Sequence, residues 1–387
     1  MFQFRDKTVY IISPERWGTM KVSKHHYALE LAAQNCRVYF IEPPQLSHTG
    51  IEIKTCADHP LISIVNYKPV FRGKRFLPSF IYSFLLRQQV KALLKKISKK
   101  PDVVWSFQGY LFQNLQWFGA PVNLFFAADQ FWYDELPAEV YSATISFAVS
   151  DTIYERIKRS GRPVYMIGHG LQKDFVQGAE ELLKNGSTVS GNKQIIAGYT
   201  GNLRMEALDR KTMMQVIEQN PEVHFIFWGS YKKNDLNLGA INNDEADAFI
   251  HFLETKNNVE LRGVVNSEEL QEQMKEADLF WLCWKIGVNA LWDGSNSHKI
   301  LEYLSTGRPV VAHHVSSYQN TDLLYMLPGK ENAGYTELFQ QTVELVKKGE
   351  AKELISKRLG TAAEKSYSNQ TGKIERFINE NLLQQNA

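Results

Sequence analysis

The sequence predicts an α/β protein with two domains, each built on a parallel sheet with helices on both faces. The chain has 387 residues, which is long for one domain and comfortable for two. Short apolar runs of strand length alternate along it with segments of helical period. Residues 177–193 are rich in glycine, serine, asparagine and charge, and they separate two such alternating series. We therefore expect a linker at 177–193, between a first domain at 1–176 and a second at 194–365.

Composition and charge are those of an ordinary globular protein. Hydrophobic residues make up 44% and charged residues 22%, and the net charge of +2 does not favour nucleic acid as a partner. The odd number of cysteines, Cys36, Cys56 and Cys283, and their lack of metal-ligand spacing favour buried thiols in a reducing cytoplasm. The apolar run at 8–13 is too short for a signal peptide, and no apolar run approaches 18 residues. We expect no leader and no membrane span.

The first domain opens with a strand, a helix and a second strand, and further strands follow along the chain. The expected strands are 8–13, 37–42, 102–107, 122–128, 143–149 and one from 164, with helices at about 23–34 and 79–100. The loop after the first strand carries Trp17 and Gly18 but lacks the G-x-G-x-x-G pattern of dinucleotide sites. His25 and His26 open the next helix. They either face a cleft or act as exposed capping residues, and both interpretations stay open.

Two polar residues follow strands of the first domain and are candidates for chemistry. Asp129 comes directly after the strand 122–128, and the carboxyl ends of parallel strands are where such sheets place their sites. It is a candidate base for an acceptor hydroxyl, and a turn-capping aspartate is the equal alternative. His169 lies in the glycine loop after the strand that starts at 164. Whether it acts chemically is left open.

Residues 68–100 are basic and rich in aromatic side chains. No acidic residue occurs between Asp58 and Asp102, whereas ten lysines and arginines do. Within this segment the predicted helix carries an apolar stripe beside a cationic one. Such a segment fits an anionic membrane surface or a lipid-diphosphate acceptor. The alternative is a domain helix with a solvated charged face.

The second domain repeats the strand and helix alternation. Its expected strands are 194–198, 223–228, 259–261, 279–284 and 309–312. The helices expected between them include 209–219, 244–256, 267–275 and 297–306. Three further helices, 335–349, 351–366 and 371–384, are expected to close the chain. The last segment, 366–387, is expected to return to the first domain. Gly198 and Gly201 follow the first of these strands, and glycine lets a backbone approach a phosphate closely. Arg204 is placed to clamp that phosphate from the side.

The most informative stretch is 292–311, WDGSNSHKILEYLSTGRPVV. A small polar loop leads into a helix whose first turn carries His298 and Lys299. These residues are unusual there, because the amino end of a helix carries a partial positive charge and favours an anion. A diphosphate over residues 295–299 would account for this choice, because lysine and backbone N–H groups would neutralise it. Glu302 is one turn on and is placed to accept ribose hydroxyls. The alternative is a surface helix with a Lys/Glu pair.

The stretch SNSHKILEYLSTGRPVV resembles the nucleotide-sugar binding segment of glycosyltransferases with the GT-B architecture, in particular family 4-like bacterial enzymes of cell-surface polysaccharide synthesis. The resemblance implies two Rossmann-like domains with parallel sheets facing across a cleft. It departs at Gly294, where many family members carry a first glutamate. This departure leaves a donor-sugar contact, and with it the stereochemistry, unassigned.

The resemblance also implies roles for particular residues. The stretch 194–204, QIIAGYTGNLR, resembles the glycine-containing first loop of the family's donor domain, and the stretch 167–175 is similar to the end of the family's first domain. The donor-binding set is Gly201, Asn202, Arg204, Gly263, Val264, Ser295, Asn296, Ser297, His298, Lys299 and Glu302, and the acceptor-side set is Trp17, Gly18, His25 and His26.

These observations predict a cytoplasmic glycosyltransferase, peripheral on the inner face of the cell membrane, that uses a UDP- or GDP-sugar and a glycan or polyprenyl-linked acceptor. No Asp-x-Asp motif and no His/Cys cluster of ligand spacing occurs in the sequence, so metal independence and no cofactor are expected. A nucleotide-sugar 2-epimerase of the same architecture and a non-catalytic nucleotide-sugar or glycan-binding protein are the alternatives.

Overall fold

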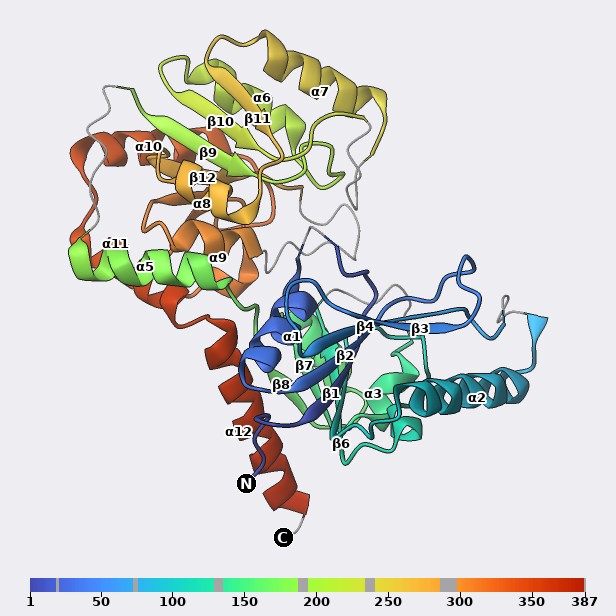
Figure 1. The fold of residues 1–387 in the computed structure, drawn as a ribbon. Coiled ribbons are helices and arrows are strands. Elements are labelled where there is room, and N and C mark those ends of the chain that lie inside the picture. The colour runs from blue at the N-terminus through green and yellow to red at the C-terminus, as the bar shows by residue number, and fades with distance from the viewer. Residues whose placement is uncertain are drawn as a thin grey trace. The chain divides into compact units, whose positions relative to one another are not determined.

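The computed structural model describes residues 1–18, 21–71, 76–128, 135–186, 194–233, 241–285 and 298–385. The chain divides into two compact units (Figure 1). Unit 1 contains residues 1–170 together with 367–387, and unit 2 contains residues 171–366. Each unit is built on its own sheet, and parallel strand pairs dominate both. The predicted α/β class with two parallel sheets is confirmed.

The expected linker at 177–193 differs from the structure. Helix α5 (Lys173–Asn185) begins before this stretch and runs through most of it, and residues 187–193 lie outside the described ranges. Phe175, Val176 and Ala179 are buried on one side of α5, which packs against α11 (Lys352–Ala363) within unit 2. The polar residues of α5 form its solvated outer face. Composition alone does not distinguish such a face from a linker.

Unit 1 contains an eight-stranded sheet of order β3-β4-β2-β1-β5-β6-β7-β8. The strands are β1 (Thr8–Ile12), β2 (Arg37–Ile41), β3 (Ile51–Thr55), β4 (Ile62–Tyr67), β5 (Val103–Ser106), β6 (Val122–Ala127), β7 (Ile145–Ala148) and β8 (Val164–Met166). All neighbours pair in parallel except β3 and β4, an antiparallel pair at one edge that the sequence analysis did not predict. The central strands are buried along their whole length, because helices cover both faces.

The helices of unit 1 include one from the far end of the chain. They are α1 (Ser23–Ala33), α2 (Ser79–Ile97), α3 (Ala138–Ser142), α4 (Asp151–Lys158) and α12 (Tyr367–Gln385). Helix α12 packs against α1, and its Glu375 and Asn379 side chains accept hydrogen bonds from the backbone N–H groups of Phe4 and Phe2, both at 2.6 Å. The N-terminal and C-terminal segments are therefore tied together within one unit.

Unit 2 contains a six-stranded sheet of order β11-β10-β9-β12-β13-β14 in which every pair is parallel. The strands are β9 (Ile196–Thr200), β10 (His224–Trp228), β11 (Val259–Gly263), β12 (Leu279–Leu282), β13 (Val310–Ala312) and β14 (Tyr325–Met326). The first five match the predicted strands. The sixth has only two residues, too few to leave a periodic pattern in the sequence.

Three helices of unit 2 begin at side chains that cap them. Beside α5 and α11, the helices of unit 2 are α6 (Arg210–Gln219), α7 (Asp244–Thr255), α8 (Ser267–Met274), α9 (His298–Leu304) and α10 (Tyr335–Lys348). Asp209, Asn243 and Asn266 stand at the N-caps of α6, α7 and α8, and each accepts a backbone N–H from the first turn. These caps fix the starts of helices that follow the strand ends.

Helix α9 is anchored to the end of β9 by Tyr303. The backbone N–H of Thr200 donates to the Tyr303 hydroxyl at 2.8 Å, and the Thr200 hydroxyl lies 3.1 Å from it. The Tyr303 ring stacks on Phe280 of β12, with 4.5 Å between ring centroids. This buried contact sets the position of α9 relative to the sheet edge.

Replacing Tyr303 by phenylalanine should leave the buried Thr200 N–H without its acceptor and lower the free energy of unfolding by about 1–3 kcal/mol. Urea denaturation of the full chain measures this. Tyr318→Phe is the control, because it removes a hydroxyl of unit 2 for which the described part of the chain shows no hydrogen bond. Equal losses in the two variants would contradict the anchoring role of Tyr303.

Candidate functional site

Three glycines stand at the carboxyl ends of three neighbouring strands of unit 2. Gly201 follows β9, Gly229 follows β10 and Gly263 ends β11, and their φ angles are +132°, +136° and +74°. L-residues with side chains rarely adopt such angles, so glycine is required at each point. Because β9, β10 and β11 are adjacent and parallel, these glycines form a row at one edge of the sheet. We call it the glycine row.

The glycine row is held together by backbone hydrogen bonds. The Gly201 N–H donates to the Trp228 carbonyl and the Gly229 N–H donates to the Gly263 carbonyl, both at 2.7 Å. A Cβ atom built on Gly229 would overlap the Gly201 carbonyl. The strand ends therefore approach each other more closely than side chains allow. The row presents bare backbone, which a ligand can approach closely.

Lys299 of α9 extends to the glycine row. A Cβ atom built on Gly201 would overlap Cε and Nζ of Lys299, so the lysine side chain passes directly over this glycine. Its Nζ lies 5.9 Å from the ring centroid of Tyr199 and 5.4 Å from that of Trp284. Aromatic faces at these distances attract an ammonium group. The arrangement places one cation at the carboxyl edge of the sheet.

Burial acts on both charges of the Lys299 and Glu302 pair, which lie one turn apart on α9. Desolvation lowers the pKa of the Lys299 ammonium, and the Glu302 carboxylate offsets part of that shift. Desolvation also raises the pKa of Glu302 to about 7, against the opposing effect of Lys299. Burial thus disfavours the charged form of each side chain. An anion beside Lys299 would favour its protonated state.

Comparison with known proteins supports one architecture. No protein-family model matches the sequence, and no curated protein matches it. Solved structures do match: a glycosyltransferase of Rickettsia africae has 10% identity and a TM-score of 0.63, covering 97% of this chain and 99% of that chain. A sucrose-phosphate synthase of Thermosynechococcus elongatus has 12% identity, a TM-score of 0.64 and coverage of 97% and 99%. HepE of Anabaena, in complex with UDP, has 12% identity, a TM-score of 0.60 and coverage of 97% and 100%.

The chain has the GT-B fold. The likeness covers almost the full length of both chains in each comparison. At such low identity it shows the fold and leaves the reaction to be argued from the residues of this chain.

The other predicted residues of the GT-B donor side fall into two groups. Ser295, Asn296 and Ser297 lie outside the described residues, together with Gly294. Asn202 and Val264 flank the glycine row. The Asn202 side chain accepts the Arg204 N–H at 2.8 Å and so shapes the loop after β9, and Val264 is 66% exposed beside Gly263. His298 opens α9 and is partly buried.

Arg204, the predicted phosphate clamp, is bonded to side chains and carbonyls of unit 2. Its guanidinium is buried and pairs with Asp247 of α7. Its Nε also donates to the Asn242 side chain at 3.0 Å, and its Nη1 donates to the Tyr231 carbonyl at 3.4 Å. Each nitrogen therefore already has a partner. The arginine joins the loop after β9 to α7, and a phosphate would have to displace these bonds.

Gly198 also has a different role from the predicted one. A Cβ atom built there would meet the rings of Phe280 and Trp228, so glycine is needed for side-chain packing inside the sheet. Only Gly201 of this pair lies at the strand end beside Lys299.

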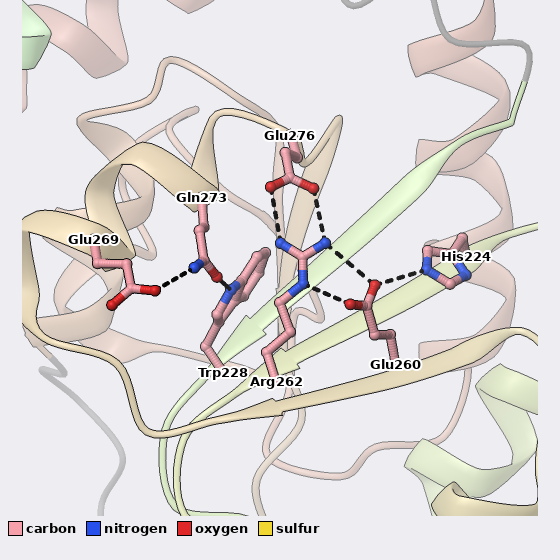
Figure 2. Close-up of polar contacts among 7 residues, drawn as sticks. All are labelled: His224, Trp228, Glu260, Arg262, Glu269, Gln273 and Glu276. Atoms are coloured by element: carbon pink, nitrogen blue, oxygen red, sulfur yellow. Dashed lines mark hydrogen bonds and ion pairs between the residues drawn. The ribbon is translucent and has the colours of Figure 1, made fainter.

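Figure 2 shows a polar network that supports the end of the glycine row at Gly263. Arg262 donates to both carboxylate oxygens of Glu276 at 2.8 Å and to Glu260 at 2.9 and 3.2 Å. Its guanidinium lies 5.4 Å from the ring of Trp228, whose Nε1 donates to Gln273 of α8 at 2.7 Å. Side chains from β10, β11 and the α8 region are thereby joined next to Gly263. Bidentate pairs of this kind hold the strand end in place.

On the acceptor side, His25 is buried and both ring nitrogens are engaged. Its Nδ1 accepts the Val22 N–H and its Nε2 lies against the Arg16 carbonyl, both at 3.0 Å. Burial lowers the pKa of His25 to about 4, so the ring is neutral at physiological pH. His25 caps α1 and packs against Trp17 and Phe40, as in the capping interpretation that the sequence left open, although the residue is buried and not exposed.

Trp17, Gly18 and His26 lie nearer the surface of unit 1. The Trp17 indole N–H donates to Asp58 at 2.6 Å, and its backbone N–H donates to Glu42 at 2.8 Å. Gly18 has open space around it. His26 stacks on Tyr367 of α12, with 5.1 Å between the ring centroids. These contacts fix the loop after β1, and none of them assigns an acceptor.

Of the two predicted catalytic residues, only His169 lies within the described part of the chain. Asp129 lies outside the described residues. His169 is buried, and its backbone carbonyl accepts the Gln370 side chain of α12 at 2.7 Å. His169 is therefore positioned by a contact within unit 1.

Sequence reasoning missed Gly229, Tyr303 and the aromatic neighbours of Lys299. One signal was available for Gly229, since it follows the apolar strand 224–228 as Gly201 follows β9. Nothing in the sequence indicated Tyr303, whose hydroxyl role depends on a partner 103 positions away. Trp284, which follows β12, lies with its ring beside the Lys299 ammonium.

Gly229→Ala should force the β9 and β10 ends apart, because the new methyl group would meet the Gly201 carbonyl at a positive φ. We expect a loss of about 1–3 kcal/mol of stability, measured by denaturation of the full chain. Gly18→Ala is the control, since open space surrounds Gly18. A Gly229→Ala protein as stable as this control would contradict the close approach of the two strand ends.

Proposed function

We propose that the protein is a glycosyltransferase that moves a sugar from a UDP- or GDP-sugar to a glycan or polyprenyl-linked acceptor in cell-surface polysaccharide synthesis. The observation that supports this proposal most is that the Lys299 ammonium lies over the backbone of the glycine row at Gly201. This is a cation beside a surface that admits close approach, at the strand ends where α/β sheets bind ligands. The GT-B fold and the resemblance of 292–311 to family 4-like enzymes support the assignment.

The donor is proposed to lie along the glycine row. Its diphosphate would contact Lys299 above Gly201, since the ammonium is a strong partner for phosphate oxygens. Its ribose would donate hydroxyl hydrogens to Glu302, one helical turn further along α9. The base would lie against the loop at Gly263, where Val264 offers an exposed apolar surface. UDP in the complex of the Anabaena protein is consistent with this donor class.

Charge stabilisation by Lys299 is the proposed source of catalysis. As the bond between the sugar and the diphosphate breaks, negative charge builds on the departing oxygen, and a fixed cation stabilises that charge more than it stabilises the intact donor. The acceptor hydroxyl attacks the anomeric carbon and must lose its proton, for which Asp129 and His169 remain the proposed bases. Arg204 is left out of this step because its guanidinium is bonded to α7.

Metal independence remains part of the proposal. Lys299 supplies the positive charge that a divalent ion would otherwise supply to a diphosphate. Within the described ranges, no group of three or more histidine, cysteine or acidic side chains is arranged to hold a metal ion. Activity that survives a chelating agent would support this part of the proposal.

We also propose that the enzyme works in the cytoplasm, on the inner face of the cell membrane. The acid-free segment between Asp58 and Asp102 supports this location, because it complements anionic lipids. A polyprenyl-linked acceptor would then be available at the same surface.

Release of nucleoside diphosphate from a small panel of donors tests the reaction class. A transferase should release UDP or GDP slowly without acceptor, because water replaces the acceptor hydroxyl, and faster with a suitable acceptor. Conversion of the donor sugar to its 2-epimer would assign the epimerase alternative. Donor binding without release or conversion by any member of the panel would assign a binding protein.

Lys299→Ala should weaken donor binding by about 10- to 100-fold, since a charge-assisted contact contributes about 1.5–3 kcal/mol. Isothermal titration calorimetry with UDP and GDP measures this. Lys256→Ala is a matched control, because Lys256 also lies over an aromatic ring of unit 2, 4.5 Å from the Phe252 centroid. Lys256 is the residue that caps the C-terminal end of α7, and it is not part of the glycine row. Equal affinities of wild type and Lys299→Ala would remove Lys299 from the site.

Affinity for the nucleotide sugar should rise with pH between about 6 and 8. The raised pKa of Glu302, about 7, means that its carboxylate forms only as pH passes this value, and the carboxylate is the form that accepts two ribose hydroxyls. The Glu302→Gln variant should bind more weakly at pH 8 and lose this pH dependence. Calorimetry from pH 6 to 8 with a UDP-sugar measures both. An unchanged slope in the variant would exclude Glu302 as its source.

A further inference from the structure

Exposed aromatic side chains gather at one end of α2. In the part of the chain that the structure describes, every phenylalanine classed as exposed lies between positions 71 and 84. Phe76, Phe80 and Phe84 are 70%, 73% and 59% exposed, and Ile81 is exposed beside them. Exposed large apolar groups scattered singly are common, but a cluster of this size marks an interaction surface.

The side of α2 that carries Phe80 and Phe84 carries basic residues toward the C-terminal end of the helix. Phe80, Phe84, Arg87, Lys91 and Lys95 follow each other at spacings of three or four residues, so they share one side of the helix. All five are exposed. The face is therefore apolar over its first turns and positive over the following ones, along about 22 Å of helix. We call it the α2 face.

Core packing does not require the α2 face. Leu86, Val90, Leu93 and Ile97 are the buried apolar residues of this helix, and they lie on its opposite side. The aromatic end is also held in place, because the Ser83 hydroxyl donates to the Gln113 side chain at 2.6 Å. Gln113 belongs to the connection between β5 and β6. The aromatic groups therefore project from a helix that is held in place.

We infer that α2 docks obliquely on an anionic bilayer, with Phe76, Phe80 and Phe84 inserted among the acyl chains and Arg87, Lys91 and Lys95 against the lipid phosphates. The polarity gradient along one helix face supports tilted insertion. A helix that lies flat on a bilayer would instead carry its apolar residues along its whole length. Charge complementarity supports an anionic bilayer, because no acidic residue occurs between Asp58 and Asp102. No helix within the described residues is both long and apolar enough to cross a membrane.

This inference deepens the membrane association of the proposed function, and vesicle binding tests it separately from sugar transfer. Full-length protein is sedimented with vesicles of phosphatidylcholine alone or with phosphatidylglycerol. Wild type should bind the anionic vesicles more strongly. Lys91→Gln/Lys95→Gln should lower that binding about 30-fold, since each basic residue near the surface contributes about fivefold. Arg159→Gln/Arg162→Gln removes the same charge from an exposed site on unit 1 and should have little effect.

A separate pair of variants tests the phenylalanines of the α2 face. Phe80→Ser/Phe84→Ser should abolish the binding that persists at about 0.5 M salt, where charge attraction is screened. Leu383→Ser, at an exposed apolar position of α12, should leave it unchanged. Thermal stabilisation by UDP or GDP reports donor binding and should be equal in all these variants. The inference would be overturned if the wild type did not bind anionic vesicles, or if the test variants bound them as their controls do. This holds whatever the thermal stabilisation by UDP or GDP shows.

Discussion

The Lys299 side chain occupies the place where a side chain on residue 201 would lie. This close approach requires glycine at the end of β9, and the neighbouring strand end requires it too, because a Cβ on Gly229 would overlap the Gly201 carbonyl. The result is a stretch of bare backbone with one ammonium above it. Every element of the proposed donor site depends on this constraint, since a single methyl group would separate the strand ends or displace the lysine.

The cations of unit 2 differ in what they contact. Arg204 and Arg262 are bonded to carboxylates, and each joins a strand end to a nearby helix region. Lys299 lies beside the rings of Tyr199 and Trp284, and burial lowers its pKa. In the proposed donor complex a diphosphate would favour the charged form of Lys299, while the two arginines keep the strand ends in position.

Much of the fold was predictable from the sequence, and the reasons are local. Apolar runs such as 223–228 and 279–284 are buried on both faces, so their composition alone indicates parallel strands. The closeness of Lys299 and Gly201 was predictable as well, because parallel strand ends share one edge. For Arg204 and His25, the spacing in the sequence indicates that a polar group lies near a strand end. The partners that these side chains bind depend on tertiary contacts, which the sequence does not reveal. Asp247 and the Arg16 carbonyl are such partners.

A crystal structure of the full chain with bound UDP or GDP tests the central claim most directly. The account predicts phosphate oxygens within hydrogen-bond distance of Lys299 Nζ, next to the Gly201 backbone, with the ribose facing Glu302. Diphosphate bound at another place in the chain, or an empty site at saturating nucleotide, would contradict it.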